Sequence, residues 1–190
     1  MQLILGLGNP GAEYESTRHN VGFAVLDIMG ERLGCSFFQR GRALVTRGEV
    51  DGRPFLLAKP TTFMNRSGRA ARDLLADLED EDPVQLLVLC DDFHLPLGQL
   101  RCRRQGSSGG QNGLASVLEM VPDGQQVARL RLGVGDPGRK PAEDYVLERF
   151  RRSEEEQAAD MQIRAADHVI DWLGDGDLDR LVNRANAPLD

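Results

Sequence analysis

One of the chain's three histidines stands where an imidazole could act as a catalytic base. His19 lies in the polar segment Ser16-Thr17-Arg18-His19-Asn20, after a first apolar run and before a stretch with helical spacing. Imidazole is the side chain best suited to accept a proton from water near neutral pH. The segment therefore predicts a site that activates water.

The other two histidines fit that role less well. His168 falls within an amphipathic stretch, a pattern that favours a surface or packing role. His94 follows Asp91-Asp92 in a predicted loop, and a metal site built from Asp92 and His94 lacks the further His or Cys ligands that zinc requires. The sequence favours His19 and predicts no metal site.

A catalytic imidazole needs a carboxylate to fix its tautomer and to stabilise the imidazolium. Asp91 and Asp92 follow an apolar run of strand length and are the natural candidates, with a turn or helix-cap role as the alternative for each. Hydrolysis also needs donors for a developing oxyanion. Four asparagines lie at the boundaries of predicted elements, where carboxamides also serve as caps: Asn9, Asn20, Asn65 and Asn112.

The segment Gly6-Leu7-Gly8-Asn9-Pro10-Gly11 matches the dinucleotide fingerprint G-x-G-x-x-G. In that motif the helix begins within the glycines, whereas here a polar run follows them. Asp27 lies at about the distance of the ribose-binding acid, but it falls inside a helical pattern instead of ending a second strand. We therefore expect no nicotinamide cofactor.

Gly106-Ser107-Ser108-Gly109-Gly110 matches the nucleophile elbow G-x-S-x-G, so a serine esterase using Ser108 is the first alternative. The run Arg101–Gln105 before it is polar, unlike a central nucleophile strand, and only His168 follows as a partner. The second alternative is a non-catalytic RNA-binding protein, which the low aromatic content of 5% disfavours.

Strand and helix patterns alternate along the chain without a long linker or repeat. This predicts one α/β domain over residues 1–190, with a twisted mixed sheet covered by helices on both faces. Asp51-Gly52 predicts a hairpin between Ala43–Val50 and Pro54–Ala58. Ser153 and Glu156 predict a capping box that opens a helix to about Leu173. Ligands of such folds bind at the carboxyl ends of strands, where the polar clusters are expected to converge.

The net charge of −7 argues at first against a nucleic-acid partner, but the charge is unevenly distributed. Residues 101–152 carry ten Arg and Lys against six Asp and Glu, so they predict a basic face able to bind phosphate, with scattered solvated charge as the alternative. The three cysteines show no metal-ligand spacing, and neither a signal peptide nor a run of about 20 apolar residues is present. We expect a cytoplasmic protein.

Five blocks of sequence, in order along almost the whole chain, resemble the bacterial peptidyl-tRNA hydrolase family. They are Leu5-Gly6-Leu7-Gly8-Asn9-Pro10-Gly11-x-x-Tyr14-x-x-Thr17-Arg18-His19-Asn20-x-Gly22, Lys59-Pro60-Thr61-Thr62-Phe63-Met64-Asn65-x-Ser67-Gly68, Asp91-Asp92-x-x-Leu95-Pro96-x-Gly98, Gly109-Gly110-Gln111-Asn112-Gly113-Leu114 and Arg131-Leu132-Gly133-Val134-Gly135. The last forty residues carry little of the resemblance.

The resemblance implies a usually monomeric enzyme without a cofactor that cuts the ester between a peptide and the 3′-terminal ribose of tRNA, recycling tRNA from prematurely released peptidyl-tRNA. It implies that His19 is the general base, that Asp91 and not Asp92 supports it, and that Asn9 distinguishes N-blocked peptidyl from free aminoacyl substrates. Further positions are implied to contact the peptide or the tRNA 3′ end or to line the cleft: Tyr14, Phe63, Met64, Asn65 and Asn112.

Two features go beyond that pattern. Basic side chains of the region 101–152, which include Arg101, Arg103 and Arg131, are suited to hold the acceptor phosphates of the tRNA without reading sequence. Where many relatives have Gly-Gly-His-Asn-Gly, this chain has Gln111, and glutamine does not titrate. A polar contact is expected at that position instead of a proton relay.

Overall fold

The first strand, β1 (Gln2–Gly6), is buried over its whole length. It runs between two parallel neighbours, β4 (Arg53–Pro60) and β5 (Gln85–Asp92), with helices over both faces. A strand covered on both faces is expected to be continuously apolar, which explains the run Leu3-Ile4-Leu5. The computed structural model describes residues 1–81, 83–122 and 126–188.

The described strands form one sheet in the order β2-β3-β4-β1-β5-β7-β6. Its remaining strands are β2 (Phe38–Arg40), β3 (Ala43–Val50), β6 (Leu100–Arg103) and β7 (Val127–Gly133). Strands β4, β1, β5 and β7 are parallel, while β2, β3 and β6 join antiparallel at the two edges. The predicted mixed sheet is confirmed.

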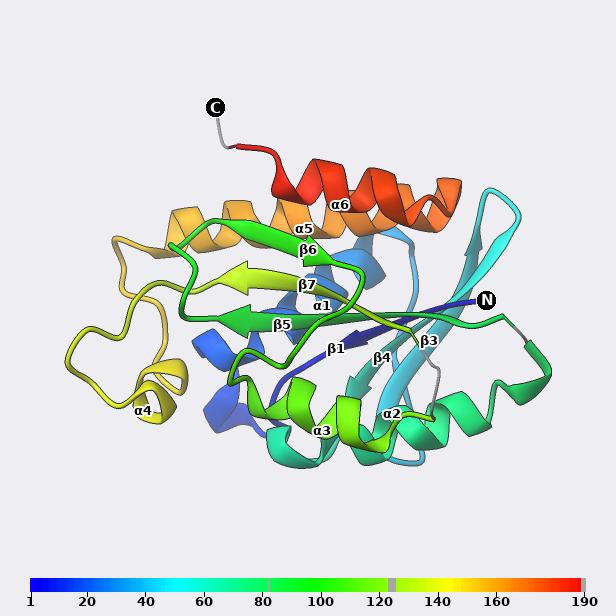
Figure 1. Ribbon diagram of the computed structural model, residues 1–190, viewed down its shortest axis with the longest axis horizontal. Coiled ribbons are helices and arrows are strands. Elements are labelled where there is room, and N and C mark those ends of the chain that lie inside the picture. Colours follow the sequence, from blue (N-terminus) through cyan, green and yellow to red (C-terminus); the bar gives the residue numbers. More distant parts are fainter. Residues whose placement is uncertain (82, 123–125, 189–190) are drawn as a thin grey trace.

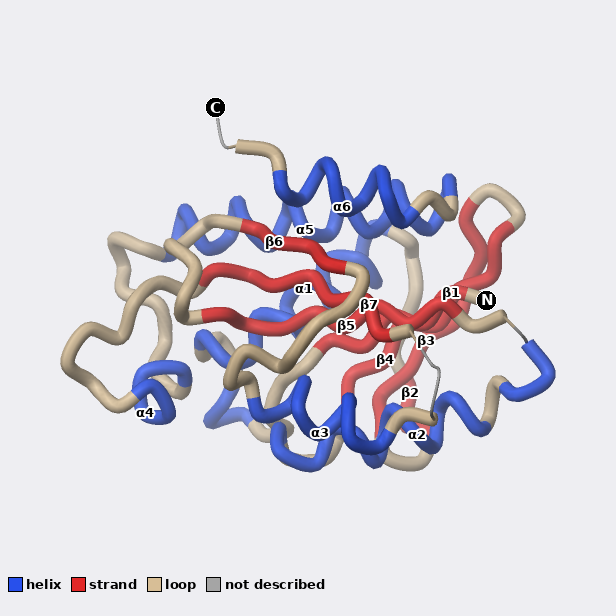
Figure 2. The backbone as a smooth tube through the Cα atoms, in the orientation of Figure 1, coloured by secondary structure: helices blue, strands red, loops and turns tan. Residues whose placement is uncertain are grey.

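Helices cover both faces of the sheet (Figures 1 and 2). One face carries α1 (Val21–Arg32) and α5 (Glu155–Asp175), with α6 (Leu178–Asn186) against β6. The other face carries α2 (Ser67–Ala76) and α3 (Asn112–Met120), which pack together. A short helix, α4 (Ala142–Val146), stands beside the ends of the parallel strands.

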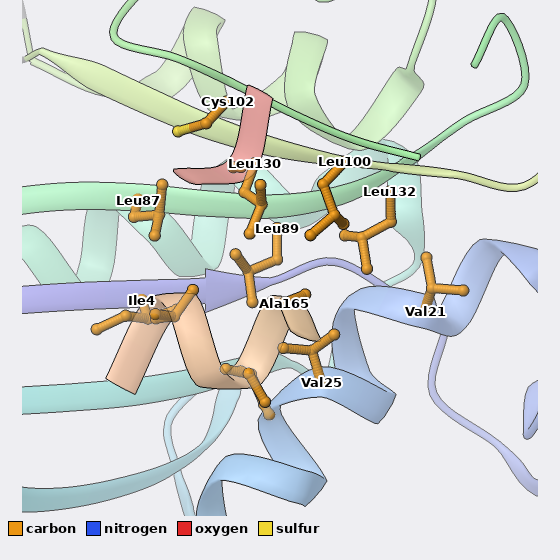
Figure 3. Close-up of a cluster of buried hydrophobic side chains, with 14 of the residues drawn as sticks. Ile4, Val21, Val25, Leu87, Leu89, Leu100, Cys102, Leu130, Leu132 and Ala165 are labelled. Carbon is orange, nitrogen blue, oxygen red and sulfur yellow. The ribbon is translucent and has the colours of Figure 1, made fainter. Parts of the chain in front are cut away.

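Each face has its own apolar core, because alternate residues of a buried strand point to opposite sides. Ile4, Leu87 and Leu89 face α1 and α5, where they meet Val25 and Ala165 (Figure 3). Leu3, Leu5 and Val88 belong to the core beneath α2 and α3. The two cores fix how the strand ends are aligned at the edge that carries the polar residues.

The predicted hairpin is confirmed: β3 and β4 pair in register from Ala43 with Pro60 to Val50 with Arg53. Asp51 and Gly52 have φ values of 49° and 77°. Two successive left-handed residues make the turn whose twist matches that of the flanking strands. The sequence pattern was sufficient here because the determining interactions are local.

The predicted capping box at Ser153 is wrong. Helix α5 begins at Glu155, and Glu154 occupies the preceding cap position without a side-chain capping bond. The Glu154 carboxylate instead accepts hydrogen bonds from the backbone of Arg151 and from the guanidinium of Arg18. The residue before this helix is therefore engaged by a distant ion pair and by the Arg151 backbone instead of by a capping box at Ser153.

Candidate active site

The carboxyl ends of β1 and β5 open into a cleft of about 400 Å³. Parallel strands end at the same edge of a sheet, so the segments that follow β1 and end β5 meet there. The residues that line the cleft come from five separate parts of the chain: Asn9, His19, Phe63, Met64, Asn65, Asp91, Phe93, Gly110, Gln111, Asn112, Ala142, Glu143, Val146 and Leu147. Seven of the residues predicted from the sequence are among them.

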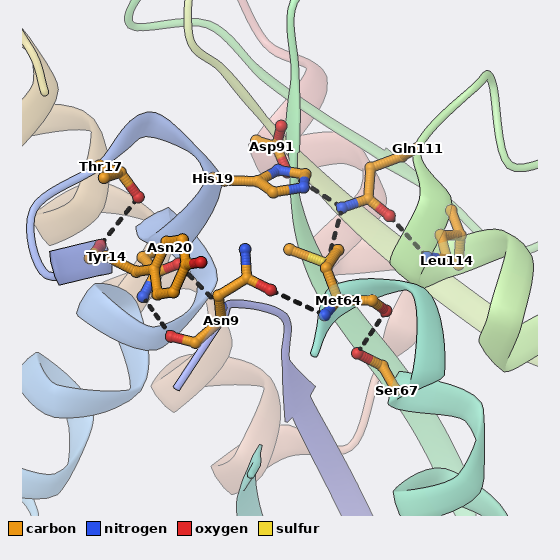
Figure 4. Close-up of polar contacts among 10 residues, drawn as sticks. All are labelled: Asn9, Tyr14, Thr17, His19, Asn20, Met64, Ser67, Asp91, Gln111 and Leu114. Atoms are coloured by element: carbon orange, nitrogen blue, oxygen red, sulfur yellow. Dashed lines mark hydrogen bonds and ion pairs between the residues drawn. The ribbon is translucent and has the colours of Figure 1, made fainter. Parts of the chain in front are cut away.

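His19 and Asp91 form the central contact of this cleft (Figure 4). Nδ1 of His19 lies 2.9 Å from Oδ1 of Asp91, and the side chains are 12% and 2% exposed. An ionised carboxylate only accepts hydrogen bonds, so the contact requires the proton on Nδ1. The lone pair of the neutral ring is then on Nε2, as a base for water requires.

Asp92 has different partners, although it is the neighbouring residue on β5. Its Oδ1 accepts the backbone N–H of His94, and its Oδ2 lies 3.0 Å from the guanidinium of Arg131. Successive residues of a strand point to opposite faces, which separates the two carboxylates. Of the two aspartates, only Asp91 contacts His19.

Asn9 has a fixed side chain. Its Oδ1 accepts the backbone N–H of Met64 at 2.8 Å, and its backbone N–H and C=O are both bonded to the carboxamide of Asn20. Since Oδ1 is occupied, Nδ2 is the polar group of Asn9 that remains for the cleft, and none of the described hydrogen bonds uses it. Asn9 thus presents donors to a ligand.

Arg18 holds the segment that carries His19 against the wall formed by α4. Its buried guanidinium donates to Glu154 at 2.7 Å and stacks on the rings of Tyr145 and Phe150. Burial raises the pKa of the Glu154 carboxyl, but hydrogen bonds from Arg18 and the Arg151 backbone outweigh it and bring that pKa below its ordinary value. The backbone N–H of Arg18 also donates to the backbone carbonyl of Glu148.

The wall formed by α4 is the part of the site that the sequence analysis missed. Ala142, Glu143, Val146 and Leu147 line the cleft, and no motif marked them. The only local signal is Pro141 with the acidic residues Glu143 and Asp144 in the following turn, a common helix start. Phe93, also missed, follows directly after the predicted aspartates and closes the cleft beside them.

The other residues implied to contact substrate are distributed unevenly. Phe63, Asn65 and Asn112 are exposed at the cleft, and Phe63 is 56% exposed. Met64 is buried and lines the cleft floor. Tyr14 lies in a short 3-10 helix, Ala12–Tyr14, and is not among the lining residues.

The basic residues lie on β6 and β7 outside the cleft. Arg101 and Arg103 are exposed on the edge strand, opposite Arg131 and Arg129 of β7. Arg131 is nearly buried and engaged by Asp92 and the carbonyl of Ser107, which corrects the expectation that its side chain is presented to phosphate. Burial and the charge of Arg131 lower the pKa of Arg129, which also holds the carbonyl groups of Gly106 and Ser107.

The rival nucleophiles find no support in this geometry. The glycine-rich loop of Ser108 follows β6, an edge strand, whereas His168 lies on α5, which packs on the opposite face from α3. Cys90 precedes Asp91, but burial, with the charge of Asp91 adding to it, raises the pKa of its thiol to about 12. Neither Ser108 nor Cys90 is therefore placed and activated as a nucleophile for the cleft.

The surroundings of Asp27 differ from those of a dinucleotide-binding acid. Asp27 lies within α1 and pairs with Lys59, and α1 begins only at Val21, so the dinucleotide fingerprint is contradicted as expected. Among residues 1–81, 83–122 and 126–188, no group of three or more His, Cys, Asp and Glu side chains is arranged to hold a metal ion. No helix within those ranges has the length and apolar character that crossing a membrane requires.

An imidazole that is held by a buried carboxylate and opens onto a cleft of an α/β sheet is an arrangement that hydrolases use. Comparison with known proteins agrees with this class. The family model described as peptidyl-tRNA hydrolase matches residues 3–189. The chain belongs to the peptidyl-tRNA hydrolase family.

Individual relatives cover nearly the whole chain. The peptidyl-tRNA hydrolase of Lactiplantibacillus plantarum is 40% identical over 98% of this chain and 100% of that protein. That of Chloroflexus aurantiacus is 42% identical over 98% and 99%. The crystal structure of peptidyl-tRNA hydrolase from Acinetobacter baumannii superposes with a TM-score of 0.87 at 30% identity, covering 98% of this chain and 95% of that one.

Proposed function

We propose that this chain hydrolyses the ester between a peptide and the 3′-terminal ribose of tRNA, using a water molecule activated by His19. Membership of the family carries the substrate class. The contact between His19 and Asp91 in the cleft carries the mechanism, because it leaves Nε2 of a neutral imidazole available to a water molecule. Turnover of purified peptidyl-tRNA by the purified protein is the direct test, and binding without turnover would instead indicate an RNA-binding protein.

The reaction needs one base and one set of donors. Nε2 of His19 takes a proton as the water oxygen attacks the ester carbonyl, and Asp91 stabilises the imidazolium that forms. The bond from the carbonyl carbon to the ribose oxygen then breaks, and His19 returns the proton to that oxygen. Donors of Asn9 in the same cleft are suited to the carbonyl oxygen as it gains charge.

Asp91 supplies the charge that supports His19, and its neighbour provides a matched control. In Asp91→Asn the acceptor oxygen remains but the charge is lost, so we expect kcat to fall by at least about tenfold, or about 1.4 kcal/mol of transition-state stabilisation, with little change in KM. Asp92→Asn weakens the ion pair with Arg131 and is expected to lower the melting temperature, with a smaller loss of kcat than in Asp91→Asn. Steady-state kinetics of both variants provide the measurement. A larger loss of kcat in Asp92→Asn than in Asp91→Asn would contradict the assignment.

The exposed cations of β6 are proposed to hold the phosphates of the acceptor stem. Arg101 and Arg103 are exposed on the edge strand, and neither has an ion pair with a described carboxylate. Contacts of this kind supply affinity that is independent of sequence, as an enzyme acting on many tRNAs needs. Arg131 supports this region indirectly by holding the carbonyl of Ser107 in the glycine-rich loop.

Arg103→Ala is expected to weaken the binding of different tRNAs by similar factors and to reduce the slope of log K against log salt by about one. Cleavage of a small ester without the tRNA body should hardly change. The control is Arg40→Ala, since Arg40 lies on β2 at the opposite edge of the sheet. Binding titrations over a range of salt provide the measurement, and a large loss on the small ester would place Arg103 at the reacting centre.

We further propose that the enzyme acts as a monomer in the cytoplasm, with no protein partner needed for catalysis. Support comes from the reaction itself, since the proposed base, its carboxylate and the Asn9 donor are all supplied by the same chain and the proposed chemistry needs no residue of a second copy. Light scattering of the active protein tests the oligomeric state. A dimer that loses activity when diluted to monomer would contradict this part of the proposal.

A further inference from the structure

We propose that Gln111 is a positioning residue of the reaction: its side-chain amide holds the Asp91 carboxylate in the orientation that serves His19. This rests on the base role proposed for His19 and adds a third member to the pair. It also gives a function to the glutamine that stands where the pattern of many relatives has histidine. The argument depends on the direction of one amide group, which the surrounding contacts determine.

The amide of Gln111 cannot be reversed. Gln111 caps α3, and its Oε1 accepts the backbone N–H of Leu114 at 2.5 Å. An amide nitrogen does not accept hydrogen bonds, so the cap requires oxygen at this place. The nitrogen, Nε2, must then face the other way, toward Asp91 (Figure 4).

Nε2 of Gln111 lies 3.0 Å from Oδ1 of Asp91 and 3.3 Å from the sulfur of Met64. Oδ1 is the same oxygen that lies 2.9 Å from Nδ1 of His19. Two donors from different segments therefore meet on one oxygen of a buried carboxylate. Together they restrict rotation of the carboxylate and so the direction of the imidazole that it holds.

The backbone around Gln111 is shaped for this contact. Gly109 and Gly110 have φ values of 59° and 85°, in the left-handed region that side chains other than glycine rarely adopt. A side chain at Gly113 would collide with the sulfur of Met64, so glycine there lets α3 approach the cleft. Gln111 is consequently 6% exposed, and its polar atoms are held before a substrate arrives.

Glutamine brings a donor to Asp91 without bringing charge. The titratable side chains that line the cleft are His19, Asp91 and Glu143. Behind them on β5, Asp92 is paired with Arg131, and the thiol of Cys90 is buried. A cation at position 111 would oppose protonation of His19 during the reaction, whereas a neutral amide keeps Asp91 as the charge that the imidazolium meets.

Gln111→Glu separates this role from simple capping. Glutamate has nearly the same shape and keeps an oxygen for the N–H of Leu114, and an acidic residue is favourable at a helix start. It removes the donor to Asp91 and places a second carboxylate against it. We expect kcat to fall by about tenfold or more. The acid limb of the kcat/KM profile should move to higher pH, because the added negative charge favours the protonated imidazole.

The matched control is Gln2→Glu, which changes another buried glutamine at the opposite end of β1, bonded to the carbonyl of Trp172. That variant is expected to melt at lower temperature but to keep the wild-type pH profile. A second variant, Gln111→His, restores an N–H donor but adds a titrating group. We expect it to keep kcat within about tenfold of wild type and to steepen the acid limb of the profile.

The outcomes are distinguishable from failure of the proposed function. If His19→Ala is inactive while Gln111→Glu keeps the wild-type kcat and pH profile, Gln111 is only a helix cap and the inference is overturned. If Gln111→Glu does not fold, the test rests on Gln111→His. An acid limb of its kcat/KM profile that is as steep as in the wild type then overturns the inference. If His19→Ala itself remains active, the base role of His19 fails first.

Discussion

His19→Ala is expected to remove nearly all hydrolysis of peptidyl-tRNA while leaving the fold and tRNA binding largely intact. The physical reason is that His19 is the only histidine among the residues that line the cleft, and its Nδ1 is already committed to Asp91. A positioned base typically contributes about 10²–10⁴-fold to a rate, so we expect a loss of that size in kcat. Alanine in place of a partly buried imidazole leaves room for water but no base.

Two measurements make this result decisive. His94→Ala is the control, because His94 is an exposed histidine that follows β5 and bonds Asp92 only through its backbone. It should retain most of the activity. Thermal unfolding and tRNA binding of His19→Ala should remain close to wild type. Activity above about a tenth of wild type would show that His19 is not the base, given the size of effect expected for general base catalysis.

The second large effect is expected for Asn9→Asp. The structure sharpens the role of Asn9, because its Oδ1 is occupied by the N–H of Met64 and its Nδ2 is what remains for the cleft. Aspartate keeps the acceptor for Met64 but replaces the donor with a negatively charged oxygen. Removal of one donor to an oxyanion typically costs about 10²–10³ in kcat, and we expect a loss in that range on peptidyl-tRNA.

The same variant is expected to alter substrate choice. Peptidyl-tRNA presents a neutral amide near the ester, whereas aminoacyl-tRNA presents an amine that is protonated in part. A donor such as Nδ2 is suited to an amide carbonyl and offers nothing to an ammonium, whereas a carboxylate attracts one. The ratio of peptidyl-tRNA to aminoacyl-tRNA cleavage should therefore fall in Asn9→Asp.

Parallel assays with the two substrates measure that ratio. Asn183→Asp is the matched control, since Asn183 is exposed on α6, outside the cleft-lining residues, and the substitution adds the same charge. It should leave both rates and their ratio unchanged. If Asn9→Asp slows both substrates equally and only modestly, Asn9 serves the turn that Asn20 braces and not the choice of substrate.

The sequence by itself determined the features that depend on local interactions and on burial pattern. The turn Asp51-Gly52 defined its hairpin because the required backbone angles belong to those two residues. The apolar runs of β1 and β5 indicated buried strands, since a strand covered on both faces is expected to be almost continuously apolar. The sequence also singled out His19, as the histidine of a polar segment between a predicted strand and a predicted helix.

The tertiary structure decided the choices among chemically similar residues. It selected Asp91 over Asp92 as the partner of His19, because the direction of a side chain on β5 has meaning only once the neighbouring segments are in place. It also placed the start of α5 at Glu155, and it showed that Glu154, just before the helix, pairs with Arg18, a residue far away in the sequence.

The same reason applies to the amides of the site. From the sequence, Asn9 and Gln111 could donate or accept, and either could be a simple cap. Their directions follow from the backbone N–H groups of Met64 and Leu114, which occupy their oxygens and leave their nitrogens for substrate and for Asp91. A carboxamide has no preferred direction until its partners are fixed in space, and folding alone supplies those partners.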